Sequence, residues 1–290
     1  MRWITRWCSL LCVLMAGSLT QASAQPAGRI ADLVLPQQAQ SLSFFSSLGM
    51  GIWKPEGDGP FPALILLHTC GGVSQHIGTW RKEAITRGYL VMILDSFSAR
   101  GSPSCRPRAP IPMERGVQDI SDAVAHLAAL PGVDPNRIGV MGFSWGGMAA
   151  LLNGSTGYRA ATPINGRTPT AVVSVYPSCY IGPFSSFPGA EFLRQDLATP
   201  TLVLMGAADT ESPPQDCLDR LTQLRERRAP VEWEVISDAT HCWDCQDKHG
   251  YRSSPPWAGG RTVEYRYDGK ATGLSIERAF AFLAQRMPAR

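Results

Sequence analysis

Three polar residues have the types and the order needed to attack a carbonyl carbon. Ser144 is the centre of Gly-Phe-Ser-Trp-Gly at residues 142–146, which fits the nucleophile-elbow pattern G-x-S-x-G. Asp209 and His241 follow it, and acid before base is the order in which the partners of such a serine occur. A serine hydroxyl becomes an effective nucleophile when a histidine removes its proton and a carboxylate orients that histidine. We therefore predict a catalytic triad of Ser144, His241 and Asp209.

Each residue of the predicted triad follows a predicted strand. Ser144 and Asp209 follow the apolar runs at residues 138–141 and 201–206, which are typical of buried strands, and His241 follows the strand expected at residues 231–236. The small apolar residues 147–152, directly after the elbow, predict a helix packed on the sheet. A sharp turn from strand to helix would lift the Ser144 hydroxyl above the sheet edge, and flanking glycines leave room for that turn.

Strands and helices alternate along the rest of the chain. Apolar runs predict further strands at residues 42–53, 63–67, 89–94 and 171–176. Apolar residues at helical spacing predict helices at residues 80–87, 117–127, 218–224 and 276–283. This alternation predicts an α/β fold, with a mostly parallel central sheet covered by helices on both faces. Ligands bind beyond the carboxyl ends of the strands in such sheets, so we expect the chemistry in the loops that follow strands.

A glycine-rich turn, His-Thr-Cys-Gly-Gly at residues 68–72, follows one of these strands. An acyl-transfer site needs backbone N–H groups that hold the oxyanion of the reaction. We expect one from Trp145, next to the nucleophile, and a second from Cys70 or Gly71. The glycines would also let the substrate approach the backbone at Gly71. A plain tight turn would need the same glycines, but the elbow motif favours the functional interpretation.

Other residues could replace the predicted acid or base. Asp209 could simply be a turn residue, and Asp238 lies too close in sequence to His241 to occupy the preceding loop. His249 lies farther than His241 from the end of its strand. The remaining histidines lie too early in the chain or within a helix: His68, His76 and His126.

Residues 241–249 also fit H-C-x-x-C-x-x-x-H, which is similar to a zinc cluster. A zinc ion would occupy the predicted base, and the thiols of an exported protein tend to be oxidised. A c-type haem is excluded because Gln246 stands where that motif requires histidine. We therefore expect no metal and no cofactor.

The first 24 residues have the composition of a signal peptide. Arg2 and Arg6 precede an apolar stretch at residues 7–19, and residues 22–24 form a small-residue cleavage site that ends at Ala24. The stretch is short for a membrane span, so we expect no membrane insertion after its removal. The sequence thus predicts a periplasmic or secreted protein with one domain at residues 25–290.

Charge and cysteine content narrow the partners further. The formal charge of +3 falls to +1 without Arg2 and Arg6. A protein so close to neutral has no overall positive field that would attract nucleic acid. In an exported chain, the six remaining cysteines predict up to three disulfides, with 15 possible pairings. The sequence leaves the pairing open among Cys70, Cys105, Cys179, Cys217, Cys242 and Cys245.

With these motifs the chain resembles the dienelactone hydrolase family of the α/β-hydrolase superfamily. The likeness runs from about residue 63 to the final helix. It rests on the following motifs: residues 68–72, 94–97, 142–147 and 206–209, together with His241. The resemblance implies an α/β-hydrolase fold, no metal, and a triad that acts on the carbonyl of a small ester or lactone.

The chain departs from the namesake enzymes at the nucleophile. They use cysteine where this sequence has Ser144, so a general serine esterase is expected rather than an enzyme for dienelactones. Arg100 is similar to a family arginine that holds a substrate carboxylate. Arg106 and Arg108 could assist it, or all three could be solvated residues of a loop.

The chain is also similar to secreted polyester hydrolases, which have the same triad order and disulfides near the acid and base loops. A Cys217–Cys242 bridge would tie those loops together, while Cys179–Cys217 and Cys70–Cys105 pairs are equally compatible with the sequence. A cutinase-like polyester hydrolase is therefore one alternative, and a non-catalytic binding protein on the same fold is another. The sequence specifies neither the substrate nor the oligomeric state.

Overall fold

The computed structural model describes residues 28–31, 49–105, 111–162, 164, 166–181, 189–255, 258 and 260–289. The expected signal segment and residues 42–48 of the first expected strand region lie outside this part of the chain. Within it, none of the helices has the length and apolar character that crossing a membrane requires.

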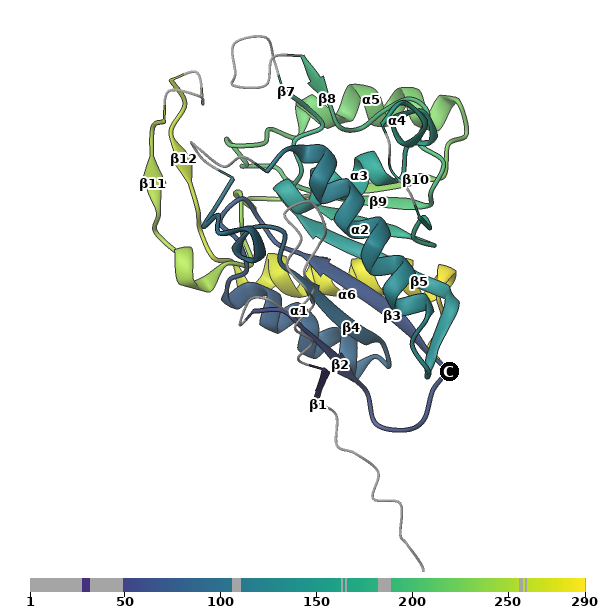
Figure 1. Ribbon diagram of the computed structural model, residues 1–290. Helices are drawn as coiled ribbons and strands as arrows, with labels where there is room; N and C mark the ends of the chain where they lie inside the picture. Colours follow the sequence, from purple (N-terminus) through teal and green to yellow (C-terminus); the bar gives the residue numbers. More distant parts are fainter. Residues whose placement is uncertain are drawn as a thin grey trace, which may run out of the picture.

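A central eight-stranded sheet organises the molecule (Figure 1). Its strands lie in the order β1-β2-β4-β3-β5-β6-β9-β10. The β1–β2 and β2–β4 pairs are antiparallel, and all other neighbours are parallel. The bounds are β1 Gly28–Ala31, β2 Gly51–Lys54, β3 Phe61–Leu67, β4 Leu90–Leu94, β5 Val133–Phe143, β6 Val172–Val175, β9 Thr201–Gly206 and β10 Val231–Ile236. The mostly parallel sheet that the sequence predicts is thereby confirmed.

The β3 strand shows why continuous apolar runs identify the central strands. Leu64 and Leu66 point into the core on one face of the sheet. Ala63, Ile65 and Leu67 point into the core on the other face. Because both faces of a parallel sheet are covered by helices, nearly every residue of such a strand is apolar.

The helices form a layer on each face of the sheet (Figure 1). One layer contains α1 Gln75–Thr86 and α6 Gly269–Arg286, whose apolar residues share a core cluster. The other contains α2 Met113–Ala128, α3 Trp145–Asn153 and α5 Gln215–Glu226, and the short α4 Thr156–Ala161 follows α3. Helices α1 and α6 begin earlier than predicted because their first turns carry polar residues that interrupt the apolar spacing.

Two short hairpins and two short 3-10 helices escaped sequence analysis. They are β7 Tyr180–Ile181 with β8 Ala190–Glu191, β11 Arg252–Ser253 with β12 Val263–Glu264, η1 Ser98–Arg100 and η2 Gln246–Lys248. Segments of two or three residues are too short for a periodic pattern to show. The β11–β12 hairpin stands beside the carboxyl edge of the sheet (Figure 1), and it leads into Tyr265.

Candidate active site

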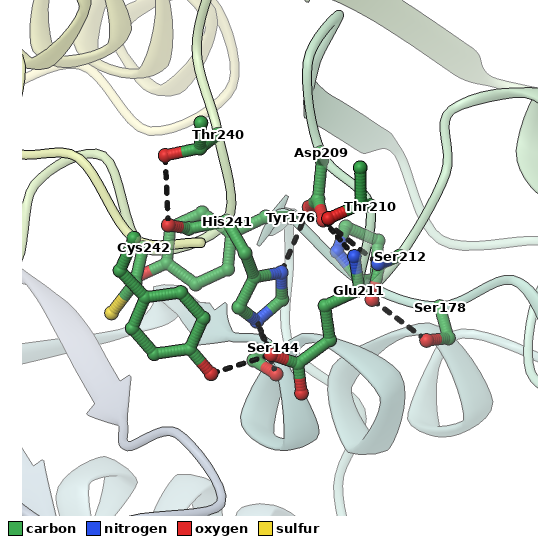
Figure 2. A network of polar contacts seen from close by, with 12 residues as sticks. Ser144, Tyr176, Ser178, Asp209, Thr210, Glu211, Ser212, Thr240, His241 and Cys242 are labelled. Carbon is green, nitrogen blue, oxygen red and sulfur yellow. Dashed lines mark hydrogen bonds and ion pairs between the residues drawn. The ribbon is translucent and has the colours of Figure 1, made fainter. Parts of the chain in front are cut away.

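The carboxyl ends of β5, β9 and β10 bring Ser144, Asp209 and His241 together (Figure 2). His241 Nε2 lies 3.0 Å from Ser144 Oγ, and His241 Nδ1 lies 2.8 Å from Asp209 Oδ2. All three residues are buried, with Ser144 the most exposed at 8%. A hydroxyl, an imidazole and a carboxylate thus form one hydrogen-bonded chain at the sheet edge.

Ser144 occupies a strained turn between β5 and α3. Its φ of 50° and ψ of −109° lie where a side chain is unfavourable, as is typical of functional positions. The turn needs the glycines on either side. A Cβ atom at Gly142 would lie 2.1 Å from the Gly146 carbonyl oxygen, and one at Gly146 would lie 2.4 Å from the Leu67 carbonyl oxygen. The predicted elbow conformation is therefore present.

The Asp209 carboxylate is held in place by its own loop. Its Oδ1 accepts hydrogen bonds from the backbone N–H groups of Glu211, at 2.9 Å, and Ser212, at 2.8 Å. The other oxygen is thereby directed at His241 Nδ1. An acceptor at Nδ1 favours the tautomer that carries its proton there, which leaves Nε2 able to accept the Ser144 proton.

A second buried carboxylate, that of Asp244, connects the loop of His241 to the protein core. Asp244 Oδ1 accepts a hydrogen bond from the Tyr176 hydroxyl at 2.8 Å, and Oδ2 accepts one from Trp80 Nε1 at 2.7 Å. The Tyr176 ring in turn packs against the imidazole, with 4.9 Å between ring centroids. Burial and the negative charge of Asp244 raise the pKa of Tyr176 well above its ordinary value, which keeps its hydroxyl a donor.

Carboxylates dominate the electrostatic environment of His241. Burial disfavours the imidazolium, but the negative charges of Asp209, Glu211 and Asp244 outweigh it and raise the pKa of His241 to about 9. The Glu211 carboxylate lies 4.0 Å from His241 Nε2, on the side of the ring that faces Ser144. Its Oε2 also accepts a hydrogen bond from the Tyr265 hydroxyl. The site therefore holds an imidazole that readily accepts a proton.

Glu211 and Tyr265 were not predicted as site residues. Glu211 lies two residues after Asp209, so its place in the acid loop was the available signal. Tyr265 carried no signal, because it follows a two-residue strand and reaches the site only through the β11–β12 hairpin.

The rival acid and base lie elsewhere. Asp238 is exposed, and the exposed His249 accepts a hydrogen bond at Nδ1 from the backbone of Tyr267. His68 is buried, and the burial lowers its pKa. Its ring links loops, because Nδ1 lies 2.7 Å from the Thr69 carbonyl oxygen and Nε2 accepts the Ser96 N–H.

The two N–H groups expected to hold the oxyanion belong to the first turn of α3 and to the glycine-rich turn after β3. Trp145 begins α3, so its N–H has no carbonyl partner within the helix. The next N–H, of Gly146, is bound to the His68 carbonyl oxygen, and that of Gly71 donates to Thr69 Oγ1 at 3.2 Å. Of the two donors considered in the glycine-rich turn, Cys70 is therefore the better candidate.

Arg100 makes a different contact from the one the resemblance implies. Its two terminal nitrogens donate to the two oxygens of Asp119, each at 2.8 Å, and one also donates to the Ser96 carbonyl oxygen. This guanidinium therefore already holds a carboxylate of the protein itself. A role in binding substrate stays a prediction, and Arg106 and Arg108 lie outside the described residues.

The six cysteines form three disulfides, Cys70–Cys105, Cys179–Cys217 and Cys242–Cys245. The Cys217–Cys242 bridge considered above is absent, because each partner is paired elsewhere. Cys242 and Cys245 bring their sulfur atoms close to Asp244, but the bond between them removes the thiolates that zinc requires. Three disulfides are typical of an oxidising environment.

The sheet topology and the strained serine turn together define an α/β hydrolase. The dienelactone hydrolase family profile matches residues 50–287, and the chain belongs to this family of hydrolases.

Curated relatives and solved structures agree with this assignment. A Salmonella typhimurium protein proposed to be a carboxymethylenebutenolidase is 28% identical over 227 residues, which covers 73% of this chain and 80% of that protein. A proposed dienelactone hydrolase from Klebsiella pneumoniae superposes with a TM-score of 0.58 and 26% identity, over 81% of this chain and 93% of that one. Esterase 2 of Thermogutta terrifontis shares the fold, with a TM-score of 0.61, 18% identity, and coverage of 83% and 89%.

Proposed function

We propose that the protein is an exported serine hydrolase that cleaves carboxylic esters or lactones. The observation that carries the proposal is the hydrogen-bonded chain from Ser144 through His241 to Asp209, at 3.0 and 2.8 Å. A bare serine is a weak nucleophile, and this arrangement is the one that activates it. The three disulfides support export to an oxidising compartment.

The reaction follows from the positions of the atoms. Ser144 Oγ attacks the carbonyl carbon while His241 Nε2 takes the hydroxyl proton, and the Asp209 carboxylate stabilises the imidazolium. The N–H groups of Trp145 and Cys70 hold the negative oxygen of the tetrahedral intermediate. His241 then gives its proton to the leaving alcohol. A water molecule, deprotonated by the same imidazole, then attacks the acyl carbon; the bond from that carbon to Ser144 Oγ breaks, and His241 returns the proton to Ser144 Oγ.

The proposal is tested by the substitution Ser144→Ala. The purified variant should retain the wild-type circular dichroism spectrum and thermal midpoint, and should lose hydrolysis of nitrophenyl esters. Removal of a triad member typically costs several orders of magnitude in kcat. Ser178 offers a matched control because it lies nearby and bonds to the Ser212 hydroxyl instead of an imidazole. Ser178→Ala should keep its activity.

Covalent labelling tests the nucleophile directly. Thermogutta terrifontis esterase 2 is phosphorylated by paraoxon, so an organophosphate is a suitable reagent for this fold. The wild-type protein and Ser178→Ala should take up one phosphoryl group on the peptide that contains Ser144. Labelling of Ser144→Ala at the same rate, or no labelling and no ester hydrolysis by the wild-type protein, would show the proposal to be wrong.

A further inference from the structure

The carboxylate of Glu211 lies beside the reacting atoms, but it takes no part in the proposed reaction. Glu211 Oε2 lies 4.0 Å from His241 Nε2, the same nitrogen that lies 3.0 Å from Ser144 Oγ. Figure 2 shows the Glu211 side chain running alongside the imidazole toward Ser144. The Glu211 side chain is 11% exposed, so solvent screens its charge only in part.

The position of this carboxylate is determined by the structure around it. The Glu211 backbone N–H donates to Asp209 Oδ1 at 2.9 Å, which couples the residue to the acid of the triad. At the other end of the side chain, the Tyr265 hydroxyl donates to Oε2. Tyr265 itself packs near His241, with ring centroids 5.5 Å apart. Glu211 is therefore anchored at both ends beside the reacting atoms.

Any ester that reacts here must place its carbonyl carbon about 3 Å from Ser144 Oγ. Its leaving oxygen must approach His241 Nε2, which returns the proton. Substituents within a few atoms of the scissile bond then come within reach of the Glu211 charge. A negative substituent would be repelled by it, whereas a cationic or hydrogen-bond-donating substituent could replace the Tyr265 hydroxyl as its partner.

We propose that Glu211 determines charge selectivity, so that the enzyme accepts neutral and cationic esters and rejects esters with a carboxylate near the scissile bond. The contacts of Arg100 agree with this selectivity. The family resemblance assigns this arginine to a substrate carboxylate, but its terminal nitrogens are already bound to the carboxylate of Asp119. The inference rests on the proposed esterase activity and specifies its substrate class.

The test uses two series of esters that differ only in charge. In the first series, nitrophenyl esters of equal acyl length end in a carboxylate, a methyl or a trimethylammonium group. In the second, acetates of choline, 3,3-dimethylbutanol and 3-hydroxypropionate carry the charge on the alcohol. The kcat/KM of each ester is measured for the wild-type protein and for Glu211→Gln, which can still accept the Tyr265 hydrogen bond.

A unit charge about 7 Å from a partly solvated carboxylate should change kcat/KM by roughly tenfold. The wild-type protein should therefore prefer the cationic to the anionic ester by roughly 100-fold in at least one series. In Glu211→Gln this ratio should fall to within a few fold. A change in the basicity of His241 affects all esters of a series alike, so it cannot move the ratio.

Glu226→Gln is the matched control, because Glu226 is exposed and ends α5 just before the amino end of β10, whereas the site lies at the carboxyl ends of the strands. It should keep the wild-type ratio. In the wild-type protein, raising the salt concentration from 0.01 to 1 M should also shrink the preference, which provides a measurement that needs no variant. Equal rates for all three charges, or a preference that persists in Glu211→Gln, would refute the charge selectivity. A wild-type protein that cleaves neither the neutral nor the charged esters would instead overturn the esterase function, and the selectivity with it.

Discussion

The Glu211 carboxylate should also shift the pH dependence of catalysis. Burial lowers the pKa of His241, but the negative charges of Asp209 and Glu211 outweigh this effect and raise the pKa to about 9. Only the neutral imidazole can take the Ser144 proton, so kcat/KM should rise with pH and level off above about 9. At pH 7 roughly 1% of the molecules would hold the neutral form. Substituting Glu211→Gln removes one negative charge and should lower this midpoint.

The size of the shift follows from the distance between the two groups. Unit charges about 4 Å apart interact with about 1 kcal/mol in bulk water and about 4 kcal/mol near a protein surface. The Glu211 side chain is 11% exposed and bonds to Tyr265, so an intermediate value of about 2 kcal/mol applies. Since about 1.4 kcal/mol corresponds to one pH unit, the midpoint should move down by about one to two units. Loss of a carboxylate should thus raise kcat/KM at pH 7 for a neutral ester.

The assay is the initial rate of a neutral nitrophenyl ester from pH 6 to 10, corrected for spontaneous hydrolysis and measured at constant ionic strength. The wild-type protein and the control Glu226→Gln should share one midpoint near 9. The Glu211→Gln profile should lie at lower pH, with a somewhat lower plateau because its imidazole is a weaker base. A wild-type midpoint near 6.5, or identical midpoints for the wild-type protein and Glu211→Gln, would show that the carboxylate does not act on His241 as described.

Two further predictions concern stability. Gly146→Ala should lower the free energy of unfolding by about 2–4 kcal/mol, because its Cβ would meet the Leu67 carbonyl oxygen at 2.4 Å. Gly78 lies in α1, where an added Cβ would have no atom within 4 Å, so Gly78→Ala should raise the free energy of unfolding by about 0.5–1 kcal/mol. Urea unfolding measures both variants, and similar free energies for the two would contradict this prediction. Asp244→Asn should lower the thermal midpoint, because an amide offers one acceptor to the two donors Tyr176 and Trp80, at a cost of about 1–3 kcal/mol. The exposed Asp247→Asn is the control, and equal midpoints for the two variants would exclude a structural role for Asp244.

Local patterns were sufficient to predict the framework of the fold. The strands β3, β4, β5, β6 and β9 could be predicted because a strand between two helix layers is apolar at nearly every position. The edge strand β10 could be predicted because Glu232 and Glu234 alternate with apolar residues. The elbow was recognisable because its backbone excludes a side chain at Gly142 and at Gly146, two residues before and two residues after Ser144. Chain order singled out Asp209 and His241, and their contacts agree with it, while their catalytic roles stay a prediction.

The sequence did not indicate which side chains of distant segments meet. Arg100 binds Asp119, and Tyr265 reaches Glu211 from a hairpin too short to show a periodic pattern. Disulfide pairing was open for the same reason, since six cysteines allow 15 pairings and only the packed chain brings particular pairs close. Backbone propensity depends on neighbours along the chain, and the burial of a strand or helix requires a regular pattern of apolar residues, so both can be recognised in the sequence. The charge that surrounds an imidazole depends on distances of a few ångströms between loops, which only the tertiary structure sets.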